Sequence, residues 1–421
     1  MLPSDNVCEL QFGFRQGIGT SMACSLINDV KCYFEYKQSP LYLCSLDAEK
    51  CFDSIWHAAL FFKLIDRIPD DHWLTLWRWY GGLRAAVRWS HAYSQRFSIT
   101  KGTRQGSIMS PQLFNIFIDD LLKLLSVSDD GVSIGSHCFS ASAYADDICL
   151  MSSTVPGLQR LIDICTNYAE KWTFRFNPHK TKCLISGRGI LRTEPKWLLN
   201  GDVIENVSCI EILGIHYSVK QDDVHVRCRI EKCKRCFYSL SDVGLSYPGC
   251  NSGVKAYLWN SNCQPVLLYG LDAIHVSSRN LKELEKMQSI LLKRSLGLDK
   301  RSRTTGILQA MRVRKIEERL RHGSASLIKR ICNVPNITRK LCIHFLSLYM
   351  LNKTMIPGTL VSKLLSFDLS PISCVFDVFT KSPFISDCGL TDSLRRLIMH
   401  ESFIKPYSEE HFLATLLTRS Y

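Results

Sequence analysis

Long apolar runs are missing from this 421-residue sequence, and no stretch approaches the ~20 residues that a transmembrane helix needs. Residues 1–5 also lack the basic and apolar regions that open a secretory signal peptide. We therefore expect an intracellular protein, nuclear or cytoplasmic, without a membrane partner. Its 19 Cys are then expected to be reduced, mostly buried thiols rather than disulfides.

Two common ligand-binding patterns are present only in part. Gly17 and Gly19 have no third Gly after them and no suitable strand before them, which excludes a dinucleotide fingerprint. Cys233 and Cys236 form one C-x-x-C, but no second pair follows at the spacing of a zinc finger. Packing within a helix is the favoured interpretation of these two Cys.

Acidic residues are outnumbered, because 39 Asp and Glu face 52 Lys and Arg, which gives a net charge of +13. This excess predicts an anionic partner, and nucleic acid or an acidic membrane surface are the first candidates. The hydrophobic content of 46% and charged content of 22% are ordinary for a globular chain. A chain of this length can form roughly two to four domains.

Strand and helix patterns alternate over the first 220 residues or so, whereas helical patterns dominate after about residue 224. We expect a helix over 20–36, a buried strand over 41–46 and a helix from Ser110 to about residue 125. Asp119 and Asp120 are expected on the solvated face of that last helix. Its apolar stripe is expected to pack on a sheet and consists of Leu113, Ile116, Phe117, Leu121 and Leu124.

Two adjacent carboxylates, Asp146 and Asp147, stand between two runs of β-forming residues. A hairpin with the pair at its turn is the natural interpretation, and a purely structural turn is the alternative. Like charges about 4 Å apart repel by roughly 1 kcal/mol in water and about 4 kcal/mol at an effective dielectric near 20. A divalent cation would convert that repulsion into binding, because Mg²⁺ is held by one or two carboxylates plus substrate phosphates.

Other candidate site residues lie upstream of this hairpin. Asp47 ends the strand over 41–46, a position where the strand fixes the backbone of a metal ligand or catalytic group. Gln105 has Gly close by on either side, which allows a ligand to approach the backbone. Arg15 could contact a phosphate, and a solvated or structural Arg is the alternative. Trp, Tyr and Arg alternate over 73–97, where packing in the core is favoured over base stacking.

Three carboxylates that converge from a strand end and a hairpin can hold two Mg²⁺ ions about 3.5 to 4 Å apart. With a Gly-flanked Gln and a later Lys in a loop, they form the set that nucleotidyl transfer requires. The motifs resemble those of reverse transcriptases of non-LTR (LINE-type) retrotransposons. The blocks that carry this resemblance follow the family's order: Gln-Phe-Gly-Phe-Arg at 11–15, Asp-Ala-Glu-Lys-Cys-Phe-Asp at 47–53, Arg-Gln-Gly at 104–106 with Ser-Pro-Gln-Leu-Phe at 110–114, Tyr-Ala-Asp-Asp at 144–147, Asn-Pro-His-Lys-Thr-Lys at 177–182, Ile-Leu-Gly at 212–214 and Pro-Val-Leu-Leu-Tyr-Gly at 265–270.

The resemblance implies a role for each matched side chain. Asp47, Asp146 and Asp147 would be catalytic metal ligands for two Mg²⁺ ions, with Mn²⁺ as a substitute. Lys180 would be the general acid toward the pyrophosphate leaving group. Phe52 would disfavour a 2′-hydroxyl on the incoming nucleotide. The nucleotide pocket would also include Gln105, Gly106 and Arg15.

The resemblance also implies an α+β fold: a right-hand polymerase palm of antiparallel sheet packed on helices, with partial fingers and a helical thumb. The expected ranges are 1–38 for N-terminally truncated fingers, 39–223 for the palm, 224–300 for the thumb and 301–421 for a C-terminal helical region without an assigned role. The implied activity is RNA-directed DNA polymerase, which extends a DNA primer with dNTPs on an RNA template. The alternative is a truncated, inactive relic that only binds nucleic acid.

Overall fold

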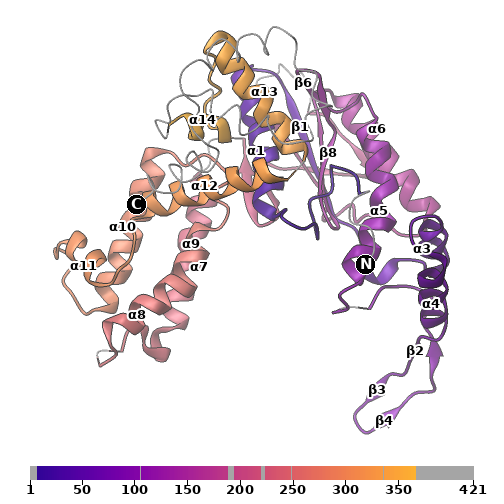
Figure 1. Ribbon diagram of the computed structural model, residues 1–421, viewed down its shortest axis with the longest axis horizontal. Helices are drawn as coiled ribbons and strands as arrows, with labels where there is room; N and C mark the ends of the chain where they lie inside the picture. Colours follow the sequence, from indigo (N-terminus) through magenta and orange to yellow (C-terminus); the bar gives the residue numbers. More distant parts are fainter. Residues whose placement is uncertain are drawn as a thin grey trace. The chain divides into compact units, whose positions relative to one another are not determined.

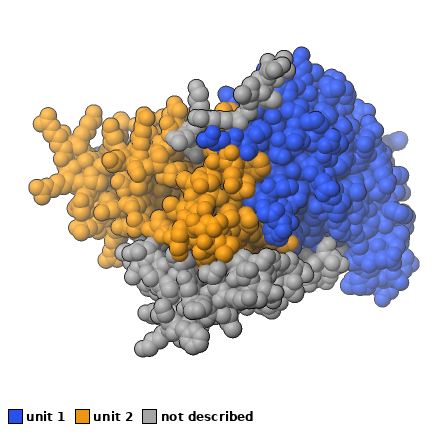
Figure 2. All heavy atoms as spheres, turned by 90° about the horizontal axis from the view of Figure 1, so that it is seen from above, with its two compact units in different colours: residues 1–23, 38–213 blue, residues 24–37, 214–421 orange. Residues whose placement is uncertain are grey.

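The computed structural model describes residues 7–104, 106–187, 194–219, 223–247, 249–334 and 336–366. The chain forms two compact units, coloured separately in Figure 2. Unit 1 comprises residues 1–23 and 38–213, and unit 2 comprises residues 24–37 and 214–421. Helix α1 (Thr20–Tyr36) begins in unit 1 and continues in unit 2.

Unit 1 is built on a five-stranded sheet with the strand order β13-β10-β1-β9-β8. Every residue of the central strand β1 (Leu41–Leu46) is buried except Ser45. This burial is expected for a short apolar strand that lies between two other strands of the sheet. All pairings in the sheet are antiparallel except that of β10 with β13. The other strands are β8 (Ala141–Tyr144), β9 (Asp147–Ser152), β10 (Lys182–Ser186) and β13 (Glu205–Asn206).

Helices α5 (Ser110–Ser126) and α6 (Val155–Lys171) pack on each other and on this sheet. The Thr154 side chain caps α6 by accepting a hydrogen bond from the Gly157 backbone N–H at 3.1 Å. The apolar stripe of α5 is buried as expected through Leu121, but it continues through Leu125, and Leu124 is exposed. The remaining helices of unit 1 are α2 (Cys51–Ser54), α3 (His57–Leu64) and α4 (Asp70–Gly81).

Short two-stranded pairs complete unit 1. Two of them form a ribbon that extends beyond α4, seen at the lower right of Figure 1. Its strands are β2 (Arg84–Ala85), β3 (Arg88–Trp89), β4 (Ala92–Tyr93) and β5 (Phe97–Ser98). The other short strands are β6 (Val132–Ile134), β7 (His137–Phe139), β11 (Leu198–Leu199), β12 (Asp202–Val203) and β14 (Cys209–Ile212).

Unit 2 is mainly helical. Strand β15 (Ile215–Ser218) packs on α7, and α12 packs on α10, α13 and α14. The later part of α1 joins these helices, because the Asp29 carboxylate accepts a hydrogen bond from the Leu360 backbone N–H at 2.9 Å. The helices are α7 (Asp223–Ser239), η1 (Ser241–Leu245), α8 (Ser252–Leu258), η2 (Trp259–Cys263), α9 (Gln264–Leu268), α10 (Ser278–Ser295), α11 (Thr304–Ala310), α12 (Ile316–Asn333), α13 (Ile337–Asn352) and α14 (Leu360–Leu365). Within the described ranges, no helix combines the length and the apolarity needed to cross a membrane.

The mixed fold with an antiparallel sheet packed on helices agrees with the sequence-based prediction. The prediction of a solvated face was wrong for Asp119 and holds only in part for Asp120, whose side chain is 38% exposed. Asp119 is fully buried and accepts hydrogen bonds from the Arg67 guanidinium at 3.0 Å and the Cys8 backbone N–H at 2.7 Å. Asp120 pairs with Lys63 and Arg67, both at 2.6 Å. This face of α5 is therefore polar because it carries ion pairs, in which Asp119 is fully buried and Asp120 is partly exposed.

Candidate active site

The three carboxylates predicted from the sequence gather at one end of the unit 1 sheet. Asp47 follows β1 directly, and Asp147 is the first residue of β9, which pairs with β1 through Leu46 and Ile148. Asp146 lies in the turn between β8 and β9, closed by the pairing of Tyr144 with Asp147. The hairpin prediction is thus confirmed, and the strand pairing brings Asp47 to the same edge of the sheet.

The charges of these carboxylates interact. Burial of the carboxyl, followed by the negative charges of Asp146 and Asp47, raises the pKa of Asp147 to about 6. Burial and the charge of Asp47 also raise the pKa of Asp146. The neighbouring Cys51 thiol has its pKa raised by burial first and then by the same two charges. The cluster is therefore a region of concentrated negative charge, which favours cations.

Lys180 is held beside Asp47 by the loop that carries it. The Asn177 backbone N–H donates to the Asp47 carbonyl oxygen at 2.7 Å, and Ala48 forms an isolated antiparallel bridge with Phe176. The Asn177 side-chain oxygen accepts hydrogen bonds from the His179 and Lys180 backbone N–H groups, which folds the loop into a tight turn. The Lys180 Nζ lies 3.6 Å from an Asp47 carboxylate oxygen. Since the Lys180 side chain is 68% exposed and the Asp47 side chain 39%, solvent screens this ion pair, which stabilises the fold by only about 0–1 kcal/mol.

Gln11 fixes the turn of the Asp hairpin, a role that the sequence did not reveal. Its side-chain oxygen is buried and accepts hydrogen bonds from the Gly13 N–H at 2.8 Å and the Ala145 N–H at 2.9 Å. Ala145 has a φ of 57°, a left-handed conformation that is unfavourable for any residue with a Cβ. A Cβ at Gly13 would lie only 2.5 Å from the Ala145 nitrogen, so this close approach requires Gly. The only available signal was the Gln-x-Gly spacing near the start of the chain.

The four residues predicted to bind nucleotide have different surroundings. Phe52 is half-buried, and its ring packs on Phe114 with the centroids 4.8 Å apart. Gly106 has a φ of 82° with open space around it, whereas Gln105 lies outside the described residues. The Arg15 guanidinium donates to the carbonyl oxygens of Gln11 and Cys8 at 3.1 and 3.4 Å. These bonds match the alternative interpretation of Arg15 as a structural residue.

The donor set suits a hard divalent cation. All three acidic side chains offer carboxylate oxygens, which Mg²⁺ and Mn²⁺ prefer, and a cation would relieve the repulsion that, after burial, raises the pKa values of Asp146 and Asp147. In the part of the chain that is described, no three acidic, His or Cys side chains are close enough to surround an ion on their own. Water or a bound phosphate would have to supply further ligands, as is usual for Mg²⁺.

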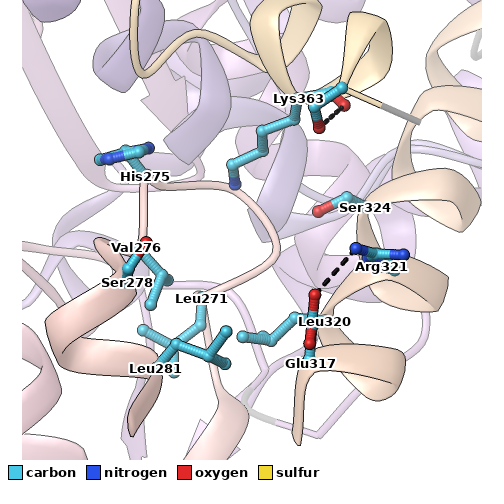
Figure 3. A pocket seen from close by; sticks show the side chains of 11 residues that line it. Leu271, His275, Val276, Ser278, Leu281, Glu317, Leu320, Arg321, Ser324 and Lys363 are labelled. Atoms are coloured by element: carbon cyan, nitrogen blue, oxygen red, sulfur yellow. Dashed lines mark hydrogen bonds and ion pairs between the residues drawn. The ribbon is translucent and has the colours of Figure 1, made fainter. Parts of the chain in front are cut away.

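Unit 2 contains a pocket of about 310 Å³, shown in Figure 3. Its charged side chains have local partners. Arg321 forms an ion pair with Glu317 at 2.8 Å, and the Lys363 ammonium donates to the carbonyl oxygens of Asp272 and Ile274. We therefore place the candidate active site at the carboxylates of unit 1.

Comparison with known proteins places these motifs in a family. The family model described as reverse transcriptase (RNA-dependent DNA polymerase) matches residues 2–217, just over half of the 421 residues. The chain is 24% identical to the RNA-directed DNA polymerase from mobile element jockey of Drosophila melanogaster over 341 residues, which are 79% of this chain and 37% of that protein. It is 25% identical to the Pol polyprotein from type-1 retrotransposable element R2 of Popillia japonica over 256 residues, which are 58% of this chain and 40% of that protein.

The chain thus spans well under half the length of these relatives. Among solved structures, telomerase from Candida tropicalis in complex with a TWJ fragment of telomeric RNA matches with a TM-score of 0.39 and 12% identity, over 74% of this chain and 49% of that one. The family model covers the whole of the sheet, the Asp hairpin and the Lys180 loop. The match shows a reverse transcriptase palm fold within residues 2–217, and the chain belongs to the reverse transcriptase family, on its non-LTR retrotransposon branch.

Proposed function

We propose that this chain is an RNA-directed DNA polymerase that extends a primer 3′-hydroxyl with dNTPs on an RNA template. The observation that carries this proposal is the gathering of Asp47, Asp146 and Asp147 at one sheet edge, with Lys180 beside them. Such a carboxylate cluster suits nucleotidyl transfer, because charge builds up on the transferred phosphate and needs cations around it.

In this proposal the three carboxylates hold two Mg²⁺ ions, or Mn²⁺ in their place. The ions would activate the attacking hydroxyl and steady the leaving pyrophosphate when bound. The chain's own residues perform the remaining tasks. Asp47, fixed by β1, keeps its carboxylate beside the hairpin, and the Lys180 ammonium can deliver a proton to the leaving group.

The nucleotide pocket is proposed around Phe52, Gly106 and Gln105. Packing of the Phe52 ring against Phe114 restricts its movement, so the ring can act as a fixed wall beneath the sugar and favour dNTPs over NTPs. Arg15 is a weaker candidate, because its guanidinium already donates to backbone carbonyl oxygens. We further propose that residues 39–223 form the palm and residues 224–300 the thumb of this polymerase.

Primer extension on an RNA template with Mg²⁺ and dNTPs tests the proposal. Asp146→Asn keeps the size of the side chain but removes one ligand charge, and we expect extension to fall by at least about 100-fold. Asp202→Asn is the matched control, because Asp202 is an exposed residue of β12 and its loss should leave the rate unchanged. Extension by the Asp146→Asn variant at the wild-type rate would refute the assignment.

The alternative function is nucleic-acid binding without catalysis, which the net charge of +13 also supports. Under this alternative the wild-type protein binds RNA, extends no primer with Mg²⁺ or Mn²⁺, and the Asp146→Asn variant binds as well as the wild type. Extension by the wild type, lost in the variant, distinguishes the polymerase from the binding protein.

A further inference from the structure

The ribbon over residues 84–98 has almost no packing of its own. Every residue from 86 to 98 is exposed to solvent. Two short ladders join its strands, Arg84 with Ser98 and Ala85 with Phe97 at the base, and Arg88 with Tyr93 and Trp89 with Ala92 at the tip. An isolated two-stranded ribbon is marginally stable in water at best. Its exposed position therefore calls for a reason beyond the stability of unit 1.

Large apolar side chains are concentrated on this ribbon. Trp89 is 81% exposed, Tyr93 69%, Val87 55% and Phe97 50%. The sequence pattern favoured packing in the core for the aromatic residues over 73–97, and that prediction holds for Tyr80 but is wrong for Trp77 and Trp79 and for the ribbon. Exposed apolar side chains that lie together on a surface mark a site where another molecule binds.

The charge around the ribbon identifies the class of that molecule. Between His72 and Ile118 the sequence contains no Asp or Glu, but it contains six basic residues: Arg78, Arg84, Arg88, Arg96, Lys101 and Arg104. The three Arg of the ribbon itself are all exposed. A basic segment that contains no acidic residue attracts polyanions, and phosphate contacts dominate the affinity of proteins for nucleic acids.

The geometry of the tip favours unpaired bases. Arg88 and Tyr93 share one face of the ribbon, with the guanidinium carbon 5.9 Å from the Tyr ring centroid, whereas Trp89 and Ala92 share the other face. Between base and tip, residues 86–87 of one strand face residues 94–96 of the other, so one strand carries an extra residue. Each face of the tip therefore presents an aromatic ring to solvent, and only bases that are free of a duplex can stack on such rings.

We propose that this basic ribbon, residues 84–98, binds single-stranded nucleic acid. Bases stack on Trp89 and Tyr93, while Arg84, Arg88 and Arg96 contact phosphates. The inference rests on the proposed polymerase function only in naming the RNA template as the natural ligand. The binding itself involves neither the carboxylates nor a metal ion, so it is measurable on its own.

The test measures the binding of fluorescein-labelled U20 RNA by anisotropy, with EDTA present so that no metal takes part. We expect Trp89→Ala to weaken binding about tenfold and Trp89→Ala/Tyr93→Ala to weaken it further, because one base stack changes affinity roughly 5- to 150-fold. Phe62→Ala is the matched control, since Phe62 is a 66% exposed aromatic residue on α3, outside the ribbon. That control should bind RNA like the wild type.

The contributions of the Arg and the aromatic side chains separate in a salt titration. The slope of log K against log salt is negative. Replacing Arg84, Arg88 and Arg96 by Gln should make it shallower by about 2, since each lost phosphate contact on a single strand removes about 0.7 from its magnitude. Trp89→Ala should leave that slope unchanged. A blunt RNA duplex as probe should show little effect of the Trp89→Ala substitution.

Three outcomes would overturn the inference. In the first, the double aromatic variant binds RNA as well as the wild type does. In the second, it loses the same affinity for duplex as for single-stranded RNA, and in the third it loses self-association while its RNA binding is unchanged. The last would assign the ribbon to contacts between copies of the chain. Primer extension by the Asp146→Asn variant reports on the polymerase proposal separately. The ribbon inference can thus fail while that proposal stands, and the reverse also holds.

Discussion

Gln11→Met is the sharpest single test of how unit 1 holds its carboxylates. The substitution keeps the length of the side chain but removes the oxygen that accepts from Gly13 and Ala145. Each buried N–H left without an acceptor costs about 1–3 kcal/mol, so two amount to about 2–6 kcal/mol. The Gln11 Nε2 is buried and has no hydrogen-bond partner among the described residues. Its removal therefore offsets about 1–3 kcal/mol of that loss. We therefore expect a net loss of about 2 kcal/mol in the free energy of unfolding.

The effect on catalysis should exceed the effect on stability. Ala145 occupies its left-handed conformation next to Asp146, and without the hydrogen bond that its N–H donates to Gln11 the turn can relax. A displacement of about 1 Å in a catalytic group can slow a reaction by about 100-fold. On the proposed polymerase function, we expect kcat for primer extension to fall by about 10- to 100-fold, with little change in KM for the dNTP.

Urea unfolding and single-turnover extension, each at a temperature where the variant is folded, measure the two effects. Gln16→Met is the matched control because Gln16 is exposed in the same segment. A variant that unfolds more easily but extends primers at the wild-type rate would refute the positioning role of Gln11. A Gln11→Met variant as stable as the wild type would also refute the expected loss of hydrogen-bond energy.

Three further predictions concern other parts of the molecule. Lys180→Met should slow extension at least tenfold, whereas Lys182→Met, which removes a Lys paired with a Glu 2.5 Å away, should not. Gly187→Ala should lower the melting temperature more than Gly201→Ala, because both Gly have a positive φ but only the Cβ at Gly187 would overlap a backbone carbonyl oxygen. Burial raises the pKa of Asp29 to about 7, so the folded state retains a proton that the unfolded chain releases near pH 4. The free energy of unfolding should then fall by up to about 4 kcal/mol between about pH 4 and 7, and in urea titrations Asp29→Asn should remove this fall.

Local patterns in the sequence predicted the parts of unit 1 that depend on local interactions. The helix over 20–36, the strand over 41–46 and the Asp hairpin each have a distinct periodicity or turn chemistry, and all three are observed. The N-terminus of α5 was also predicted, because Pro111 stands in its first turn. Features of this kind can be predicted without knowing their tertiary contacts.

The failures involve partners that are distant in the sequence. Asp119 looked like a surface residue because Arg67 stands 52 positions before it, and only the packing of α5 brings the two together. The same holds for Gln11, whose acceptor oxygen serves a turn 134 positions later. For the carboxylates, the strand-end position and the adjacent Asp pair were visible in the sequence, but their placement at one edge depends on the pairing of β1 with β9.

The carboxylates need a rigid support, whereas the ribbon of the same unit can function on a flexible one. Carboxylates that share a cation must be held to within about half an ångström, which the buried strand β1 and the Gln11 hydrogen bonds favour. Base stacking tolerates a compliant support because every base offers a π-face, so a ribbon without a core is sufficient. Variants at Trp89 should therefore raise KM for the template and leave kcat unchanged at saturating template. Variants at Gln11 should lower kcat and leave KM for the template unchanged. If the ribbon served only the stability of unit 1, variants at Trp89 would not change KM for the template in this selective way.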